Sequence, residues 1–370
     1  MKIAYFAHSF RSCWNHGNAH FIRGMARELA GRGHEVRAYE PAGGWSLANL
    51  LAAEGAAALL RFHACYPDLK PVAYGEDMDP VAELDEMDVV IVHEWNEPEL
   101  VASLARARRL GAGFLLLLHD THHRLASDPR ALAAFDLDGF DGVLAFGQSL
   151  ARLYERRGWG RHVFVWHEAA DTSLFRPPQA EAKREGVIWI GNWGDGERAE
   201  EIETYLLRPA AAAGLGLDIH GVRYPEHALE TLVRHGARYG GWLANTDAPE
   251  AYARHMATVH VPRRPYTEVL PGIPTIRMFE AMACGIPLVC APWTDAEHLF
   301  RPGTDYLEAE DGDAMARHLA ALAGDPDLRR SLARNGLETI AARHTCRHRA
   351  DELLAIVDWL RRPQRERNLA

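Results

Sequence analysis

The first half of the chain alternates short apolar runs with longer segments in which apolar residues recur every three or four positions. The run KIAYFAH, residues 2–8, is followed by a segment in which one face of a predicted helix carries Phe21, Ile22, Met25, Ala26 and Leu29. The apolar runs that follow are HEVRAYE, DVVIVHE, GFLLLLHD, GVLAFG and HVFVWHE. Continuous apolar strands separated by amphipathic helices predict a parallel sheet that is covered on both faces.

Residues 171–186 interrupt this alternation with two prolines and a run of charged residues, so we predict an interdomain linker there. The alternation restarts at VIWIGN and continues through LDIHG, TVHVPR and IPLVCAP. The pattern therefore predicts two α/β domains in tandem, over residues 1–170 and 187–345. The remaining predicted helices cover approximately residues 48–60 (alanine-rich), 199–212, 313–323, 327–343 and 346–361.

The composition is that of a globular protein, with 48% hydrophobic and 25% charged residues. A formal net charge of −10 argues against nonspecific nucleic-acid binding, which rests on a basic face. Two basic clusters, residues 106–109 and 361–367, are interpreted as solvated helix ends, with peripheral docking on an anionic membrane as the alternative. Five cysteines without a CxxC pair predict reduced thiols in a cytoplasmic protein. The apolar runs are too short for a signal peptide or a membrane span.

Four predicted strands of the first half end on a histidine, namely His8, His93, His119 and His167. The carboxyl ends of parallel strands share one edge of a sheet, and ligands bind there in open α/β folds. A single histidine of this kind is usually a structural hydrogen-bonding group. Four on one edge, together with Glu94, predict a polar cleft.

The segment HDTHH, residues 119–123, allows two interpretations. Histidine and aspartate are ligands for zinc and other transition metals, so a metal site is one of them. The spacing differs from HExxH, however, and no cysteine is near. We therefore prefer general acid–base catalysis or phosphate contact by His119 and Asp120.

The loop WNHGNAHF, residues 14–21, connects the first strand to the first helix. Gly17 would let the backbone approach a ligand closely, and amides at the helix start could receive an anion. The polar residues Asn15, Asn18 and His20 are candidates for the same cleft. The loop lacks GxGxxG, which argues against a dinucleotide site.

The segment TIRMFEAMACGIPLV, residues 275–289, predicts a short apolar helix that leads into a buried strand. Thr275 is expected to cap the start of the helix, and Gly285 follows its end, where a left-handed residue is often needed. Glu280 lies in the middle of this apolar run. An unpaired carboxylate in such surroundings costs several kcal/mol, so Glu280 should have a partner.

A nucleotide would supply that partner. The amides of Thr275, Ile276 and Arg277 could hold a diphosphate with the help of the helix dipole. Glu280, about one turn further on, could accept hydrogen bonds from two ribose hydroxyls, worth about 1.5–3 kcal/mol each. The alternative is a surface ion pair between Arg277 and Glu280, worth only a few tenths of a kcal/mol.

Two arginines follow strands of the second half, Arg198 in GNWGDGER and Arg263 after TVHVP. Each could neutralise part of the charge of a diphosphate. For either residue alone, an ordinary surface arginine is the alternative.

Taken together, these segments resemble the GT-B glycosyltransferases, especially the retaining enzymes of family 4 and, within that group, the CgeB-type proteins. The segments that carry the likeness are HGNAHFIRGMARELAGRGHEV, HDTHH, HEAADTSLFRPP, IWIGNWGDGER, VHVPR, PTIRMFEAMACGIPLVCAPW and LFRPGTDYL. The resemblance implies two Rossmann-like domains with a nucleotide-sugar bound between them. The second domain would hold the donor, the first would bind the acceptor, and the last helix, in residues 346–370, would cross back to the first domain.

By this resemblance Glu280 binds the ribose, His119 lies near the donor sugar and its phosphates, and Gly191 and Asn192 belong to the donor site. The family commonly has an additional glutamate that contacts the transferred sugar, and here Gly272 stands at its position. The CgeB-type group generally lacks that glutamate. The fold requires no DxD motif, so no metal ion or other cofactor is expected.

The resulting hypothesis is a cytoplasmic glycosyltransferase that moves a sugar from a nucleotide-diphosphate sugar to a hydroxyl acceptor, without a metal and with retention. In a retaining reaction the leaving phosphate would assist the incoming hydroxyl, whereas in an inverting reaction Asp120 or His119 would be the general base. Three alternatives stay open: a nucleotide-sugar epimerase of the same fold, a metal-dependent hydrolase built on the histidine cluster, and a non-catalytic nucleotide-sugar-binding protein.

Overall fold

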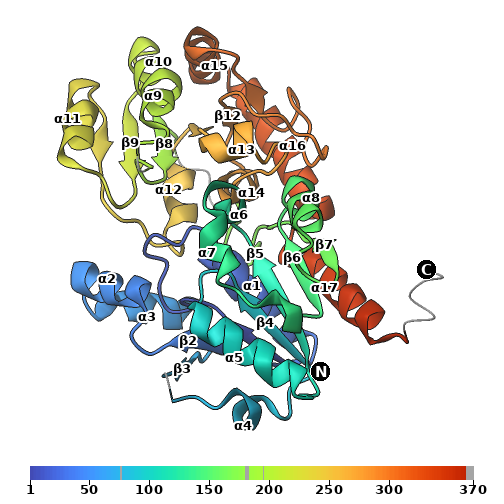
Figure 1. Ribbon diagram of the computed structural model, residues 1–370. Coiled ribbons are helices and arrows are strands. Elements are labelled where there is room, and N and C mark those ends of the chain that lie inside the picture. Colours follow the sequence, from blue (N-terminus) through green and yellow to red (C-terminus); the bar gives the residue numbers. More distant parts are fainter. Residues whose placement is uncertain (76, 180–182, 195, 364–370) are drawn as a thin grey trace. The chain divides into compact units, whose positions relative to one another are not determined.

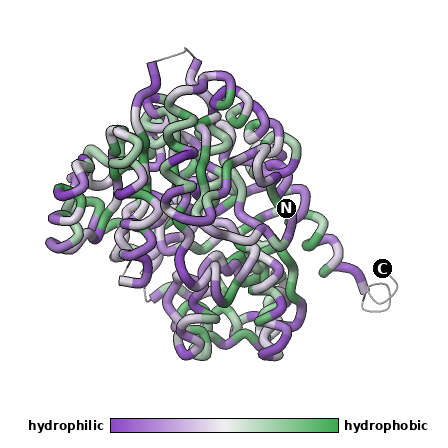
Figure 2. Tube along the Cα trace, turned by 90° about the horizontal axis from the view of Figure 1, so that it is seen from above, coloured by the Kyte–Doolittle hydropathy of each residue, from purple (hydrophilic) through white to green (hydrophobic). Residues whose placement is uncertain are grey.

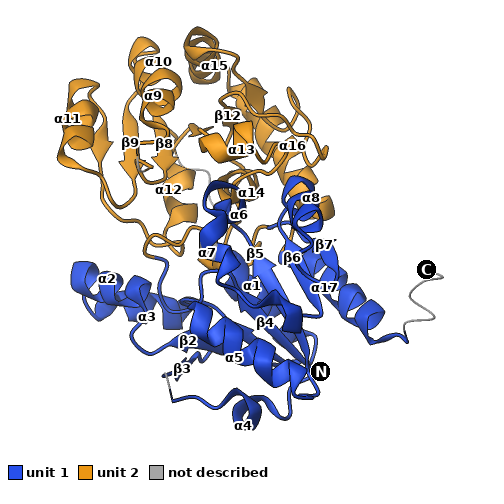
Figure 3. Ribbon diagram, viewed as in Figure 1, with its two compact units in different colours: residues 1–13, 21–168, 346–370 blue, residues 14–20, 169–345 orange. Residues whose placement is uncertain are grey.

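The chain forms two compact units, seen in the computed structural model (Figure 1) and coloured separately in Figure 3. The residues that the structure describes are 1–75, 77–179, 183–194 and 196–363. Unit 1 comprises residues 1–13, 21–168 and 346–370, and unit 2 comprises residues 14–20 and 169–345. The segment predicted as a linker, 171–186, is grouped with unit 2, and its residues 180–182 lie outside the described residues.

Unit 1 is built on a parallel sheet in the order β3-β2-β1-β4-β5-β6-β7. The strands are β1 (Lys2–Phe6), β2 (Glu35–Pro41), β3 (Val72–Tyr74), β4 (Val89–His93), β5 (Leu115–Asp120), β6 (Gly142–Ala145) and β7 (Val163–Val165). All five residues of β4 are buried, and successive side chains of a strand point to opposite faces, so helices cover both faces as predicted. Figure 2 colours the trace of the chain by hydropathy, from purple for hydrophilic to green for hydrophobic residues.

The helices of unit 1 include the predicted amphipathic segments and several short helices that the sequence pattern did not predict. They are α1 (Ala19–Gly31), α2 (Trp45–Glu54), α3 (Ala57–Cys65), α4 (Pro80–Leu84), α5 (Pro98–Arg109), α6 (Arg124–Ser127), α7 (Pro129–Ala133), the 3₁₀ turn η1 (Leu137–Gly139), α8 (Gln148–Arg157) and α17 (Cys346–Arg361). The single alanine-rich helix expected near 48–60 is wrong. Gly55 adopts a left-handed conformation (φ +68°) that ends α2, and α3 begins two residues later.

Unit 2 contains a second parallel sheet in the order β10-β9-β8-β11-β12-β13. The strands are β8 (Val187–Ile190), β9 (Leu217–His220), β10 (Arg238–Tyr239), β11 (Ala257–His260), β12 (Leu288–Cys290) and β13 (Leu307–Glu308). Both sheets have strand orders that reverse direction next to their first strand. In each unit this places the carboxyl ends of the central strands at a topological switch point, where ligands bind in such folds.

The helices of unit 2 include the predicted segment that begins near residue 199, which contains a π-helical turn. They are α9 (Ala199–Ile202), the π turn η2 (Glu203–Leu207), α10 (Arg208–Ala212), α11 (Glu226–Arg234), α12 (Ala248–Arg254), α13 (Arg264–Glu268), α14 (Ile276–Ala283), α15 (Gly312–Gly324) and α16 (Pro326–Arg343). Helices and sheet share a core that includes Val187, Trp189, Leu206, Ile219, Val259 and Leu319. The predicted tandem α/β architecture is therefore confirmed.

The last helix, α17, packs within unit 1 although its sequence follows all of unit 2. Nε1 of the buried Trp166 donates to the carbonyl of Arg349 (2.9 Å), and Nε of Arg349 donates to the carbonyl of Glu168 (3.3 Å). The thiol of Cys346 also lies against the backbone of α1, 3.9 Å from the carbonyl of Phe21. These contacts make α17 part of the unit 1 core.

All five cysteines are free of disulfide bonds, in agreement with the predicted thiols. Within the part of the chain that the structure describes, no helix combines the length and the apolar character needed to cross a bilayer.

Candidate functional site

The helix predicted to bind the donor is α14, and its two ends have the expected backbone. Thr275 precedes it in the extended N-cap conformation (φ −82°, ψ 159°), and Gly285 beyond its end is left-handed (φ +62°). The Thr275 side chain, however, forms no capping hydrogen bond with its own helix, so that part of the prediction is wrong. Its Oγ1 lies instead 3.0 Å from Nε2 of His260. The amides of the first turn have no partners inside the helix, as at any helix start.

Glu280 is fully buried on α14. Its Oε2 forms an ion pair with Nη1 of Arg277, and its Oε1 lies 3.1 Å from Nε2 of His20. Burial is the largest single influence on the carboxyl pKa and raises it, but Arg277 and His20 together outweigh burial, so the pKa lies below its ordinary value. The Arg277–Glu280 pair considered from the sequence does form. It is not a surface pair, because the carboxylate is inaccessible.

Residues 14–20, between β1 and α1, are grouped with unit 2 rather than unit 1. Asn15 has a positive φ of +51°, and its Oδ1 accepts a hydrogen bond from Nδ2 of Asn192 (3.0 Å). His20 reaches the carboxylate of α14, as described above, and Asn18 is partly exposed in the same segment. The sequence suggested an acceptor-side role for these residues, whereas the structure sets Asn15 and His20 against residues expected to bind the donor.

Two glycines of the predicted site differ in what their positions require. A Cβ added to Gly17 would meet Nη2 of Arg277 and Cγ2 of Ile276 at 3.5 Å, which is ordinary contact. A Cβ on Gly191 would lie 2.9 Å from the ring of Trp189, a distance that real Cβ atoms do not show. Gly191 is therefore needed for the packing of the turn after β8, while Gly17 has no such steric requirement.

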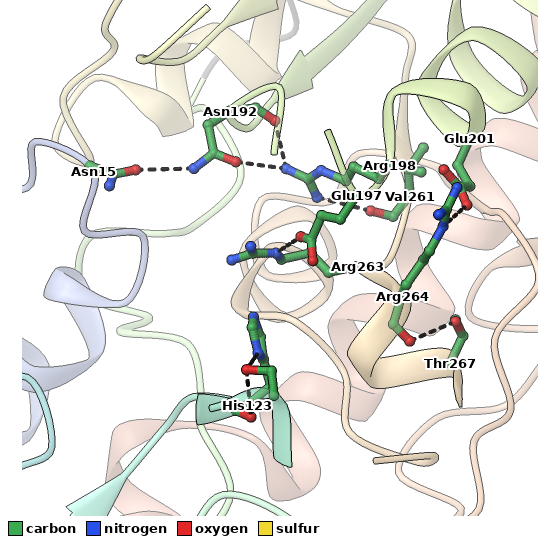
Figure 4. A network of polar contacts seen from close by, with 11 residues as sticks. Asn15, His123, Asn192, Glu197, Arg198, Glu201, Val261, Arg263, Arg264 and Thr267 are labelled. Atoms are coloured by element: carbon green, nitrogen blue, oxygen red, sulfur yellow. Dashed lines mark hydrogen bonds and ion pairs between the residues drawn. The ribbon is translucent and has the colours of Figure 1, made fainter. Parts of the chain in front are cut away.

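Arg198 is buried in the turn that precedes α9, with 7% of its surface exposed. Its guanidinium lies over the ring of Trp189, 5.2 Å from the centroid. Nη2 donates to the carbonyl (2.6 Å) and to Oδ1 (3.0 Å) of Asn192, and Nη1 donates to the carbonyl of Val261 (3.2 Å), as Figure 4 shows. These acceptors are neutral, Nε has no hydrogen-bond partner, and Arg198 forms no ion pair with any described residue.

Three arginines of unit 2 act on one another electrostatically. Burial lowers the pKa of Arg198 to about 10, and the nearby charges of Arg263 and Arg277 lower it further. Arg263 forms an ion pair with Glu197, and Arg277 forms one with Glu280 (Figure 4 shows the former). Glu197 acts in the opposite direction and raises the pKa, but no carboxylate of the described chain forms an ion pair with Arg198.

In unit 1, three histidines at or just after the carboxyl ends of parallel strands lie close together. The ring centroids of His8 and His93 are 5.9 Å apart, and those of His93 and His119 are 5.3 Å apart. Nδ1 of the fully buried His119 lies 2.6 Å from the hydroxyl of Tyr5, while its Nε2 has no hydrogen-bond partner among the described residues. Burial lowers the pKa of His119 to about 3, so the ring is neutral at pH 7. His167 follows β7 and is partly buried.

Two buried carboxyl groups accompany these histidines. Oδ2 of Asp120 accepts a hydrogen bond from the hydroxyl of Tyr154 (2.6 Å). Oε1 of Glu94 accepts one from Thr121 (3.2 Å), and its Oε2 lies 3.1 Å from Nε2 of His93. Burial raises the pKa of Asp120 to about 6, and burial together with the charge of Asp120 raises the pKa of Glu94 well above its ordinary value.

The HDTHH segment does not assemble a metal centre from the described residues. Across the ranges that the structure describes, no three His, Cys, Asp or Glu side chains converge as a metal ion would require. The rings of His122 and His123 contact each other at a tilt of 33° with centroids 4.0 Å apart, and Nδ1 of His123 lies 2.7 Å from the hydroxyl of Ser127. The geometry therefore adds no support to the metal-dependent hydrolase.

At Gly272, where the resemblance leads one to expect a glutamate, the backbone conformation favours glycine. Gly272 has a φ of +90°, and a Cβ at this position would lie 2.9 Å from Cβ of Ala296. Both observations exclude a glutamate here without movement of the surrounding chain.

The sequence analysis missed a row of polar side chains next to α14. Sγ of Cys290 lies 3.0 Å from Nδ1 of His260, whose Nε2 is the neighbour of Thr275 described above. His260 ends β11 just as His93 ends β4. His260 could have been predicted in the same way, as a histidine at the carboxyl end of a strand in the second half of the chain.

The comparisons with known proteins fit this arrangement. Residues 198–355 match the model of a family described as glycosyl transferase-like. No curated protein matches the sequence. The solved structures that resemble nearly the whole chain include Anabaena HepE in complex with UDP and glucose (14% identity, TM-score 0.67, covering 97% of this chain and 99% of that one). Sucrose-phosphate synthase from Thermosynechococcus elongatus (17%, 0.64, 97% and 99%) and a glycosyltransferase from Rickettsia africae (12%, 0.66, 97% and 98%) are also similar. The chain therefore has the GT-B glycosyltransferase fold, and Arg198, Thr275 and Glu280 all lie within its glycosyl transferase-like segment.

Proposed function

We propose that this protein transfers a sugar from a nucleotide-diphosphate sugar to a hydroxyl acceptor. The observation that carries the proposal is Arg198, a buried guanidinium that hydrogen-bonds only to neutral acceptors and forms no ion pair within the described chain, although the charge of Glu197 partly offsets those of Arg263 and Arg277. A buried charge without a counter-ion is costly, and a diphosphate would offset that cost. The N-terminus of α14 adds the favourable end of a helix dipole on the same unit.

Glu280 is the proposed ribose ligand. A carboxylate that is already held below its ordinary pKa stays ionised at neutral pH and can accept from two adjacent hydroxyls. In this proposal Arg277 leaves Oε2 and turns to the phosphates, since it is partly exposed and follows directly on the first residue of the helix. UDP is the first nucleotide to test, because HepE and other similar structures were solved with UDP or UDP-glucose.

The leaving diphosphate would be stabilised by the α14 amides and the arginines, so we propose that no metal ion is required. Unit 1 would supply the acceptor side of the reaction. Only an inverting reaction would need a protein base, and for that case His119 fits better than Asp120, because Nε2 of His119 has no partner in the described chain while Asp120 is engaged by Tyr154. In that role Nδ1–H of His119 donates to the oxygen of Tyr5.

We propose that the reaction retains the configuration of the transferred sugar. The support for this is the resemblance to family 4 and its CgeB-type members. A retaining reaction needs no strong protein base, because the leaving phosphate itself assists the incoming hydroxyl. Gly272 removes one sugar contact that family members commonly have, and the contact then has to come from other groups. We further propose that the enzyme works in the cytoplasm, without nucleic acid and with at most peripheral membrane contact.

A binding panel followed by donor turnover tests the proposal. Calorimetry with UDP, GDP, ADP, TDP and CMP should give micromolar or tighter binding for one diphosphate, and the matching sugar nucleotide should release that diphosphate when an acceptor is present. EDTA should leave the rate unchanged. Sugar conversion without any acceptor would identify an epimerase, and loss of activity on chelation would support the metal-dependent hydrolase instead. Binding with no turnover under any acceptor would indicate a non-catalytic protein, and the absence of nucleotide binding would refute the proposal.

A further inference from the structure

Beside the start of α14, three side chains of unit 2 form a hydrogen-bonded row. His260 and Cys290 end the neighbouring strands β11 and β12, and the parallel register sets them opposite each other. Nδ1 of His260 lies 3.0 Å from Sγ of Cys290, and its Nε2 lies 3.0 Å from Oγ1 of Thr275. His260 and Cys290 are buried, whereas Thr275 is partly exposed. The row thus leads from the interior of the sheet to the hydroxyl of a partly exposed residue at the helix N-terminus.

All three groups are uncharged near neutral pH. Burial, with a smaller effect from Arg198, lowers the pKa of His260 to about 3. Burial also raises the pKa of the Cys290 thiol well above its ordinary value. A neutral imidazole has one N–H and one unprotonated nitrogen, so His260 donates to one of its neighbours and accepts from the other.

Two arrangements of protons satisfy this row. In the first, Nδ1–H donates to the sulfur of Cys290, and the hydroxyl of Thr275 donates to Nε2, which leaves only oxygen lone pairs facing outward. In the second, the thiol S–H donates to Nδ1, and Nε2–H donates to Oγ1, so the hydroxyl proton of Thr275 points toward a ligand. A phosphate oxygen needs a donor and is repelled by lone pairs, so a bound diphosphate selects the second arrangement.

Resting on the proposed donor site, we infer that Thr275 binds the diphosphate of a nucleotide through its side-chain hydroxyl, and that His260 and Cys290 are positioning residues that make this hydroxyl a donor. The absence of a side-chain cap on α14 fits this role, because the hydroxyl forms no hydrogen bond with the amides of its own helix. Arg198 supports it as well, since Arg198 donates to the carbonyl of Val261, the residue that follows His260. The hydroxyl and the guanidinium would then serve the same anion.

The test compares UDP with uridine, which lacks the phosphates, on variants matched in shape. Thr275→Val removes the hydroxyl and Thr275→Ser keeps it, while Cys290→Ala removes the thiol donor and Cys290→Ser replaces it with a hydroxyl. We expect Thr275→Val to weaken UDP binding about 10- to 100-fold, the range for a hydrogen bond to a charged group. Cys290→Ala should weaken it about threefold to tenfold. Uridine affinity, measured by ligand-observed NMR, should change less than twofold throughout, and both serine variants should bind UDP nearly as well as wild type.

Because Cys290 acts only through Thr275 in this scheme, the double variant Thr275→Val/Cys290→Ala should bind UDP no more weakly than Thr275→Val alone. Long-range ¹⁵N–¹H spectra give an independent readout, with the His260 signals assigned by their loss in His260→Gln. After addition of UDP, Nε2 of His260 should be protonated and Nδ1 unprotonated, and the opposite tautomer would contradict the inference.

The outcomes separate this inference from the proposed function. If wild type binds UDP and Thr275→Val binds it equally well, the hydroxyl is not a ligand, and the proposed function stands without it. If the variants lose UDP and uridine affinity in equal proportion, the row is merely structural and the inference is again overturned. Failure of wild type to bind UDP or any other diphosphate of the panel defeats the proposed function itself.

Discussion

Replacing Glu280 by glutamine separates the structural role of this carboxylate from its proposed role in ribose binding. The substitution preserves the shape of a fully buried side chain and removes the negative charge that is paired with Arg277. Ribose hydroxyls donate to a carboxylate through hydrogen bonds worth about 1.5–3 kcal/mol each, whereas glutamine offers a single neutral acceptor oxygen. We therefore expect a loss of about 2 kcal/mol of UDP binding free energy, or about a 30-fold increase in Kd.

That loss predicts how UDP should affect the free energy of unfolding. UDP at 100 times the wild-type Kd stabilises wild type by about 2.7 kcal/mol, and the same concentration would stabilise a variant with a 30-fold higher Kd by only about 0.9 kcal/mol. The free variant should also be less stable, because Arg277 loses its counter-ion. The side chain of Arg277 is 24% exposed, so water replaces part of that interaction, and we expect a loss of about 1 kcal/mol without ligand.

Urea unfolding with and without UDP measures both quantities in one experiment. Glu268→Gln is the matched control, since it makes the same chemical change on an exposed side chain at the end of α13 and should alter neither value. If UDP stabilises Glu280→Gln by as much as it stabilises wild type, Glu280 does not contact the nucleotide. Its role would then be structural, through its contacts with Arg277 and His20.

Three further predictions concern other parts of the chain. If product analysis shows inversion, His119→Ala should lower the rate of sugar transfer about 10²- to 10⁴-fold and leave the Kd of UDP within twofold of wild type, as steady-state kinetics and calorimetry would show; an unchanged rate would exclude His119 as the base of an inverting reaction. Burial lowers the pKa of His8 to about 3, so the unfolded chain binds this proton more tightly and stability is lost as pH falls below about 6.5. His8→Phe should therefore lose about 2 kcal/mol less than wild type between pH 7 and pH 5 in urea unfolding. Gly285→Ala should destabilise the fold by about 1–2 kcal/mol because of its left-handed backbone, whereas Gly31→Ala, whose added Cβ meets nothing within 4 Å, should not.

The central strands were predictable because burial on both faces leaves an uninterrupted apolar run in the sequence. The short strands β3, β10 and β13 left no such run. They contain two or three residues each, and most of these are exposed or half-buried. The break between α2 and α3 was missed for a different reason, since Gly55 ends the helix by its backbone conformation while the alanine pattern continues past it.

The candidate site was predictable where the position in the sheet decides it, as for His8, His93 and His119. It was not predictable where two distant segments meet. Neither residue spacing nor composition indicates that His20 lies 3.1 Å from a carboxylate on α14, so its segment was assigned to the acceptor side. Likewise, the hydrogen bond between His260 and Thr275 depends on how β11 lies beside α14, and the sequence pattern alone assigned the Thr275 side chain to its own helix.

The place of α17 in unit 1 has a consequence for folding during synthesis. The ribosome makes residues 1–168 first, yet the helix that receives the indole hydrogen of Trp166 emerges only after all of unit 2. At about 5–20 residues per second, the roughly 180 intervening residues take about 10–40 s to translate. During that interval the groups of unit 1 that contact α17, such as the indole of Trp166, lack their partners. Residues 1–168, which are translated first, are therefore the part of the nascent chain that depends longest on chaperones and is longest open to proteases.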